Sequence, residues 1–290
     1  MKATKTLLAF AFAVAVFSPC KAQERAAADV TLPFELLEGH VVIPLRLNGS
    51  GAVLRFLFDT GADGMAIRRS LADSIGLAAT HRQEANVVGG KVQVAIASAS
   101  TVHLTDSFAL QNQNIALFPT IKHGLDGVIG LNLAAACVVS VDFDRRQLTL
   151  SAFGAHRNEA NAIVLPIADG QKLLILQGAL DIVGKKEVTG NFIFDTGASY
   201  HLIAFSRFVR KNRLLLTGFK PEGQASTVSM GHATPVFYGK AHSFRLSPDV
   251  AFTDMPVTLQ ASSSASTPSH APDGSIGIKL IRQFNFSIDL

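Results

Sequence analysis

The chain contains no tryptophan, only two tyrosines and two cysteines, and a charged fraction of only 17% among its 290 residues. Hydrophobic residues make up 48%, which excludes the composition of a disordered chain. Because tryptophan is absent, we expect the 20 phenylalanines to supply most of the buried aromatic surface. After residue 22 no apolar run approaches the length of about 20 residues that a membrane span needs.

The first 22 residues have the pattern of a secretory signal peptide. A basic start, residues 1–5, precedes an apolar stretch, residues 6–18, and small residues precede Gln23. The apolar stretch is short for a membrane span, so we expect cleavage after Ala22, export to the periplasm or beyond, and no stable membrane insertion afterwards. An uncleaved anchor is the alternative interpretation.

Cleavage would also remove Cys20 and three lysines. The formal net charge would fall from +4 to +1, which does not suggest a nucleic-acid surface with its clustered basic residues. Cys137 would remain as a single thiol inside an apolar run, and we expect it to be a buried small hydrophobe. No histidine has a second histidine or cysteine at metal-ligand spacing, so we expect neither a metal nor another cofactor.

One phrase occurs twice in the sequence. Residues 56–62 read FLFDTGA, and residues 192–198 read FIFDTGA. Strand–turn–strand patterns precede both copies, and similar Gly-containing strands follow them, which indicates a doubled unit. A short polar linker leads us to predict an N-terminal lobe at 23–155 and a C-terminal lobe at 156–290.

Short strands with frequent turn signals predict an all-β fold with one small helix in each half. Ser70 and Ser206 each lie eleven residues past the Asp of the phrase, where each could cap that helix.

A single Asp-Thr-Gly phrase is commonly no more than a turn after a strand. Two copies in matching contexts suggest that Asp59 and Asp195 meet at a pseudo-two-fold axis. Two carboxyls about 3 Å apart cannot both ionise, so such a pair shares one proton. The charged partner can deprotonate a water, while the protonated partner hydrogen-bonds the carbonyl oxygen of a peptide bond.

The neighbouring residues of each phrase have expected supporting roles. The glycines permit a tight turn whose N–H approaches a carboxylate, and the threonines can hydrogen-bond across the axis. These four residues are Thr60, Gly61, Thr196 and Gly197.

On these residues the chain resembles the aspartic proteases of the retropepsin and pepsin clan. A second signature is an apolar-apolar-Gly element, at residues 128–130 and, less cleanly, at residues 275–277. The resemblance covers nearly all of residues 35–290. It implies a bilobed acid-protease fold of two pseudo-two-fold-related β lobes, an endopeptidase acting on a peptide or protein in the cleft between them, and a monomeric chain.

The resemblance also implies a flap, a hairpin that closes over the substrate. Gly89 and Gly90 fit its tip in the first half, and Gly231 fits the counterpart in the second. Asp63 stands where retropepsins place an acid that binds the substrate backbone, and its counterpart is Ser199. A solvated surface acid is the alternative for Asp63, as a plain hairpin turn is for Gly89 and Gly90.

Two features depart from the family. Leu131 and Ile278 follow the apolar-apolar-Gly elements where retropepsins carry an arginine, so the salt bridge of that arginine is not expected. The sequence stops at Leu290, directly after the last predicted strand of the second half, which therefore lacks one strand or borrows it.

Two other classes of function stay open at this point. A non-catalytic peptide-binding module on the same fold would have no use for two close carboxyls. A structural or assembly protein could pair through the unfinished strand edge of the second half.

Ala62 and Ala198 follow the two Asp-Thr-Gly motifs, where a hydroxyl could stabilise the charged carboxylate and lower its pKa. We therefore predict a milder pH optimum than in relatives that carry a hydroxyl there. The double variant Ala62→Ser/Ala198→Ser should move the pH optimum of peptide cleavage to lower pH. An optimum that stays in place would contradict this prediction.

Overall fold

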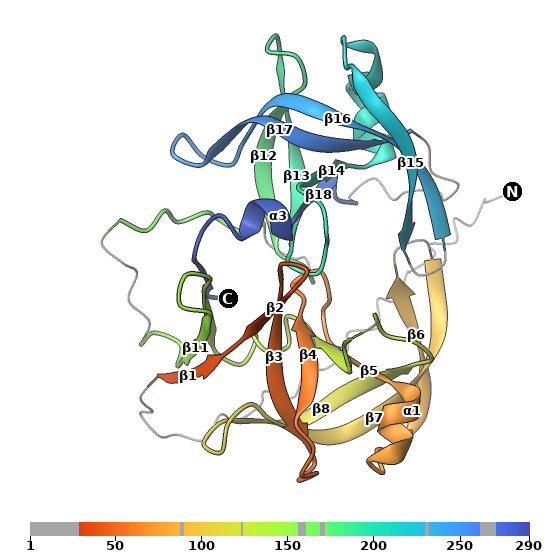
Figure 1. Ribbon diagram of the computed structural model, residues 1–290, viewed down its shortest axis with the longest axis vertical. Helices are drawn as coiled ribbons and strands as arrows, with labels where there is room; N and C mark the ends of the chain where they lie inside the picture. The colour runs from red at the N-terminus through yellow and green to blue at the C-terminus, as the bar shows by residue number, and fades with distance from the viewer. Residues whose placement is uncertain are drawn as a thin grey trace, which may run out of the picture.

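Strands dominate the computed structural model, which describes residues 29–87, 90–122, 124–155, 161–168, 172–229, 232–261 and 271–290. Two large sheets form two lobes, one above the other in Figure 1. The predicted all-β class is confirmed, with only short helices in the described ranges. None of those helices is long and apolar enough to cross a membrane.

The first large sheet has eight strands in the order β2-β3-β4-β9-β5-β8-β7-β6. Their bounds are β2 (Glu35–Leu37), β3 (His40–Leu47), β4 (Leu54–Phe58), β5 (Met65–Arg68), β6 (His81–Val87), β7 (Gly90–His103), β8 (Ala109–Phe118) and β9 (Gly127–Ile129), with helix α1 (Arg69–Ser74) after β5. An additional β3–β7 pairing curls this sheet towards a barrel.

The second large sheet has seven strands in the order β12-β13-β18-β14-β17-β16-β15, with an additional β12–β16 pairing. Their bounds are β12 (Ile175–Asp181), β13 (Glu187–Asp195), β14 (Leu202–Ala204), β15 (Pro221–Ser229), β16 (His232–Arg245), β17 (Ala251–Gln260) and β18 (Gly274–Gly277); the helices are α2 (Ser206–Lys211), the 3-10 turn η1 (Leu214–Leu216) and α3 (Ile278–Ile281). From β3 and β12 onwards, the two sheets place corresponding strands in the same order.

The predicted serine caps are wrong. Helix α1 begins at Arg69 and helix α2 at Ser206, so each serine lies inside its helix, and neither helix has a side-chain cap at its N-terminus. The backbone N–H of Ser206 is instead held by the side chain of Gln260, at 3.3 Å.

The apolar-apolar-Gly elements form β9 and β18, which run parallel to the strands that lead to the two aspartates. Strand β9 pairs in parallel with β4 and antiparallel with β5, and β18 pairs in the same way with β13 and β14. Strand β9 therefore supports the loop that follows β4 from behind, and β18 supports the loop at the end of β13 in the same way.

A third sheet joins the two halves of the chain. It has the order β1-β11-β10-β19, with β1 (Val30–Pro33), β10 (Val138–Asp142), β11 (Gln147–Ser151) and β19 (Phe286–Ile288). Among the described residues, β19 is the second half's sole strand in this sheet, and the first half supplies its partner β10.

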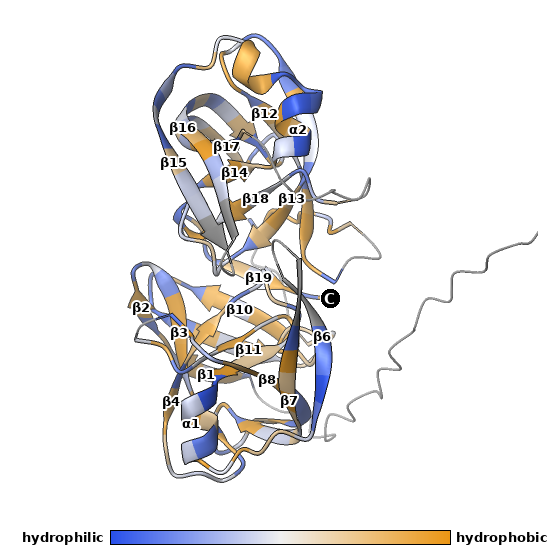
Figure 2. Cartoon of the chain, turned by 90° about the vertical axis from the view of Figure 1, so that its right-hand side faces the viewer, coloured by the Kyte–Doolittle hydropathy of each residue, from blue (hydrophilic) through white to orange (hydrophobic). Residues whose placement is uncertain are grey.

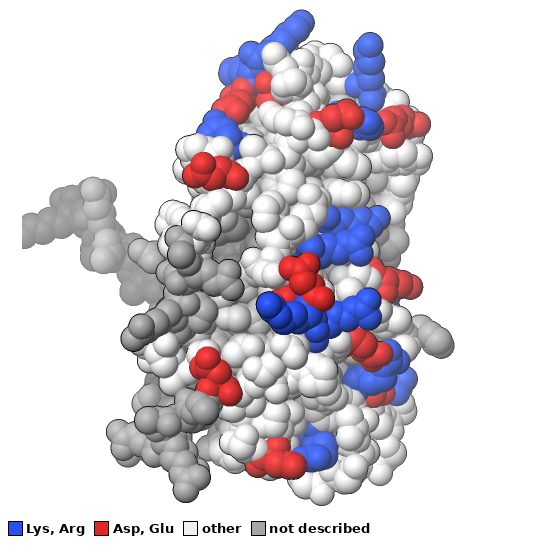
Figure 3. All heavy atoms as spheres, turned by 60° about the vertical axis from the view of Figure 1, so that its left-hand side comes forward, with Lys and Arg blue, Asp and Glu red and all other residues white. Residues whose placement is uncertain are grey.

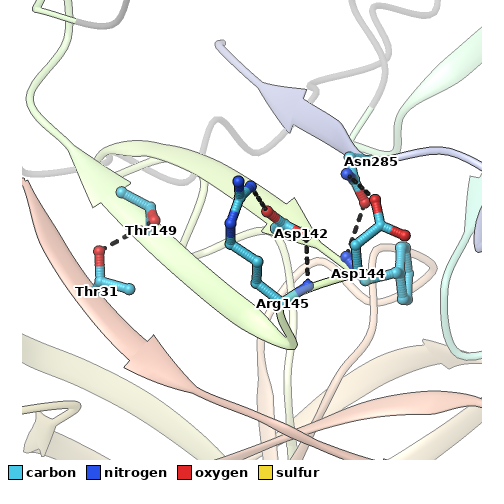
Figure 4. Close-up of polar contacts among 7 residues, drawn as sticks. Thr31, Asp142, Asp144, Arg145, Thr149 and Asn285 are labelled. Atoms are coloured by element: carbon cyan, nitrogen blue, oxygen red, sulfur yellow. Dashed lines mark hydrogen bonds and ion pairs between the residues drawn. The ribbon is translucent and has the colours of Figure 1, made fainter.

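Asn285 fastens this C-terminal segment to the turn between β10 and β11 (Figure 4). Its side chain accepts a hydrogen bond from the Phe143 N–H at 2.8 Å and donates one to Asp144 at 2.9 Å. The hydroxyls of Ser140 and Ser287 meet at 2.7 Å on the adjoining strands. These contacts hold the end of the chain against the first half.

Phenylalanines fill the cores and connect them, as expected of a chain without tryptophan. The fully buried rings include Phe56, Phe58 and Phe192. Phe143, Phe194 and Phe286 pack against both lobe cores. Phe286 packs edge-on against Phe194, the residue directly before Asp195, with 5.1 Å between the ring centroids. Figure 2 shows apolar strands inside each lobe and a hydrophilic β6 on the outside.

Surface charges are paired locally on the face drawn in Figure 3, where acidic and basic side chains lie next to one another. Arg55 binds Glu35 at 2.6 Å, and Lys122 binds Glu38 at 2.5 Å. Such exposed pairs contribute little to stability, but they balance charge along the first lobe.

A substitution at Gly274 tests the close packing of β18 against β13 and β14. A methyl group there would lie 2.3 Å from the Ile203 carbonyl oxygen and 2.7 Å from the Phe192 ring. Gly274→Ala should therefore lower the free energy of unfolding by about 3 kcal/mol in urea titrations. Gly51→Ala, where nothing lies within 4 Å, is the control and should change it by less than about 0.5 kcal/mol. Equal effects of the two variants would contradict the packing described here.

Candidate active site

The two aspartates lie at the ends of equivalent strands. Asp59 directly follows β4, and Asp195 is the last residue of β13. Each strand is anchored by fully buried phenylalanines, Phe56 and Phe58 in the first lobe and Phe192 in the second. Rigid, buried strands thus present both loops at the junction of the lobes.

The two threonines after the aspartates hold the loops together by reciprocal hydrogen bonds. The Thr60 N–H donates to Thr196 Oγ1 at 3.0 Å, and the Thr196 N–H donates to Thr60 Oγ1 at 3.0 Å. The hydroxyl of Thr60 donates to the Phe194 carbonyl at 2.5 Å, and that of Thr196 donates to the Phe58 carbonyl at 2.7 Å. Both threonines are completely buried, so these four bonds are shielded from water.

The two glycines leave room for the carboxyl of the opposite lobe. The Gly61 N–H donates to Asp59 Oδ1 at 2.8 Å, and the Gly197 N–H donates to Asp195 Oδ1 at 3.0 Å. A methyl on Gly61 would lie 2.6 Å from Asp195 Cγ, and one on Gly197 would lie 2.3 Å from Asp59 Cγ. Only glycine allows both carboxyls into this shared space.

The carboxyls of Asp59 and Asp195 interact directly and are hard to ionise together. They hydrogen-bond to one another. Burial raises the pKa of both groups, and the charge of Asp59 adds to the rise at Asp195, whose pKa reaches about 7. The hydrogen bonds from Gly61 and Asp195 partly offset the rise at Asp59. Below neutral pH this arrangement offers one acid and one base side by side.

Comparison with known proteins finds a similarity in the first lobe. Residues 43–133 match the family model described as aspartyl protease. The first lobe is therefore similar to an aspartyl protease. The match runs from β3 past β9 and includes Asp59, so the resemblance seen in the sequence is confirmed for this lobe. No curated protein matches the chain at a significant level.

The second Asp-Thr-Gly loop has a support that the sequence did not reveal. His40, at the start of β3, is buried, and its Nδ1 lies 2.9 Å from the Thr196 carbonyl oxygen. Because a carbonyl can only accept, Nδ1 donates this bond. Its Nε2 lies 2.9 Å from Ser199 Oγ. The first lobe therefore holds the loop of Asp195 by a side chain that lies 156 residues earlier.

Asp63 lies at the exposed margin of the first loop. Lys172 of the second half approaches it at 3.9 Å, and both side chains are mostly in solvent. An ion pair this long and this exposed contributes little to stability. Binding of a substrate backbone by Asp63 stays a prediction.

Hairpins stand where the flap and its counterpart were predicted. Gly90 pairs with Val87 at the end of the β6–β7 hairpin, and Ser229 pairs with His232 at the end of β15–β16. The two hairpins reach towards each other on one side of the molecule (Figures 1 and 2). Gly89 and Gly231 lie outside the described residues, and closure over a substrate stays a prediction.

Metal ligands were not expected, and in the described ranges no group of three or more His, Cys, Asp or Glu residues is placed to hold a metal ion. Cys137 is buried, as expected, and burial raises the pKa of its thiol to about 12.

Thr60→Val tests the threonine interlock. Valine has a similar volume but no hydroxyl, so it leaves the Thr196 N–H and the Phe194 carbonyl without these partners in a buried site. The free energy of unfolding should fall by about 2 to 4 kcal/mol in urea titrations. Thr60→Ser keeps the hydroxyl and is the matched control; a Val variant as stable as the Ser variant would show that the interlock contributes nothing.

Proposed function

We propose that the protein is an aspartic endopeptidase that hydrolyses peptide bonds with a water activated by Asp59 and Asp195. The observation that supports this most strongly is the pair of carboxyls brought into one space by the two loops, with burial raising the pKa of each. A pure binding module or an assembly protein gains nothing from such a pair, since it is costly to bury.

In the proposed reaction, a water molecule lies between the carboxyls. The charged carboxylate accepts a proton from this water as the water oxygen attacks the carbonyl carbon of the peptide. The other carboxyl gives its proton to the carbonyl oxygen, which produces a neutral tetrahedral diol. The diol then collapses: one hydroxyl returns its proton to the dyad, the nitrogen receives a proton from the dyad, and the C–N bond breaks. The dyad again holds one proton.

Each lobe contributes one carboxyl, so a single chain contains the whole proposed site. This supports a monomeric enzyme with a peptide or protein substrate lying between the lobes. The β6–β7 and β15–β16 hairpins, which extend on one side of the molecule, are the proposed covers for that substrate. Export to the periplasm or beyond is also proposed; it rests on the N-terminal sequence pattern, which lies outside the described residues.

Isosteric replacement of either aspartate tests this proposal. Asp59→Asn and Asp195→Asn should each lower kcat/KM for peptide cleavage by about a thousandfold or more, because neither variant can form the singly protonated pair. Both should keep the wild-type circular dichroism spectrum and lose tight binding of a statine-type transition-state mimic.

Asp106→Asn is the matched control, since the Asp106 side chain is 93% exposed and pairs with Arg46 at the surface. It should retain wild-type activity. Undiminished cleavage by folded Asp59→Asn or Asp195→Asn would refute the proposed enzyme, and mimic binding without cleavage by the wild type would favour the peptide-binding module.

A further inference from the structure

The two lobes differ directly behind the paired carboxyls. Strand β18 places Ser275 beside Ile193, at the position where β9 places Val128 beside Leu57. Ser275 is 1% exposed, and its hydroxyl donates to Asp195 Oδ2 at 3.4 Å. Val128 has no polar atom to offer to Asp59. The second lobe thus has a donor that the first lobe lacks.

Tyr200 supports this serine from the other side. Its side chain hydrogen-bonds Ser275, and it follows Asp195 by five residues, as Gly64 follows Asp59. The ring is seated on Gly277, where a methyl would lie 2.8 Å from Tyr200 Cδ2. At Gly64 a methyl would meet nothing within 4 Å, so the first lobe leaves this space open.

The hydroxyl of Tyr200 remains protonated through the working range of the dyad. Burial, and next the negative charge of Asp195, raise the pKa of Tyr200 well above its usual value. Tyr200 can therefore donate to Ser275, whose own O–H is directed at Asp195. Such a chain of hydrogen bonds strengthens its members in a buried site.

The carboxyls consequently have unequal partners. Both Oδ1 atoms accept the N–H of a glycine in their own loop, but only Asp195 accepts a side-chain hydroxyl at Oδ2. This hydroxyl comes from β18 and not from the residue after Asp-Thr-Gly, where Ala198 has none. In the described part of the chain, no hydroxyl of the first lobe occupies the corresponding place at Asp59.

We propose that Ser275, supported by Tyr200, is a positioning residue that anchors Oδ2 of Asp195 and thereby sets the pH at which the dyad loses its shared proton. The inference rests on the proposed function, because it concerns the protonation of that dyad. A reaction that needs one acid and one base proceeds only while the pair holds one proton, so a donor to Asp195 helps to set the upper pH limit of activity.

The direction of the effect follows from the donor. A hydroxyl that donates to a carboxylate favours its charged form, so Ser275 opposes the rise that burial and Asp59 impose on the pKa of Asp195. The other titratable groups that act on the pair are Tyr200 and His40, whose charge acts on Asp59. Loss of the Ser275 hydroxyl should raise the pKa of Asp195 further.

Ser275→Ala tests the inference through the pH profile of kcat/KM. Activity should disappear at high pH when Asp195 loses the shared proton. In Ser275→Ala this basic limb should move to higher pH by about half a pH unit or more. Val128→Ala, the equivalent position of the first lobe, is the matched control and should leave the limb in place. Ser275→Thr restores a hydroxyl and should restore the wild-type limb.

Tyr200→Phe separates the role of the tyrosine. It keeps the ring but removes the hydroxyl, so the limb should move in the same direction by a smaller amount. In the Ser275→Ala background it should cause no further shift, because Tyr200 acts through Ser275. If Ser275→Ala does not fold, Tyr200→Phe alone tests the direction; a basic limb that does not move in the folded variant overturns the inference.

A readout without substrate separates this inference from the proposed function. The titration of carboxyl ¹³C signals in Asp-labelled protein, assigned with Asp195→Asn, should show the higher Asp195 midpoint in Ser275→Ala. An unchanged midpoint refutes the role of Ser275. A shifted midpoint in a protein that cleaves no peptide supports the role of Ser275 and refutes the peptidase.

Discussion

Four hydrogen bonds between two buried threonines and the opposite loop set the geometry on which the candidate site depends. Thr60 and Thr196 each donate and accept across the junction of the lobes, so neither loop can shift without breaking bonds in the other. The glycines then leave room for the carboxyls to share one space. Because this space is buried, the two carboxyls in it cannot both be charged.

Around this symmetric interlock the two lobes are supported differently. His40 reaches from the first lobe to the loop of Asp195, and Ser275 with Tyr200 supports the same carboxyl from behind. The loop of Asp59 has Val128 at the corresponding place, and its margin is open to solvent at Asp63. Peptide hydrolysis by a carboxyl pair needs an acid and a base at once, so a symmetric scaffold with one-sided supports suits the proposed chemistry.

The sequence indicated the two aspartates of the candidate site, but not the side chains that hold them in place. Short strands with frequent turn signals predicted the all-β class. The doubled phrase predicted which aspartates meet, because each copy follows an apolar strand that fixes where its loop emerges. His40 could not be found in this way, since its partners lie 156 and 159 residues away and no motif marks them. Ser275 looked like a flaw in an apolar element, although its hydroxyl has a partner. The serine caps were wrong because Ser70 and Ser206 lie within their helices.

The central claim is that two lobes of one chain build a single carboxyl pair that acts on a tetrahedral intermediate. A crystal structure with a statine-type mimic bound tests this most directly, through the distances from the hydroxyl of the mimic to the two carboxyls. The account predicts that this hydroxyl lies between Asp59 and Asp195, about 3 Å from an oxygen of each. Carboxyls more than about 6 Å apart, or a mimic bound away from them, would contradict the account.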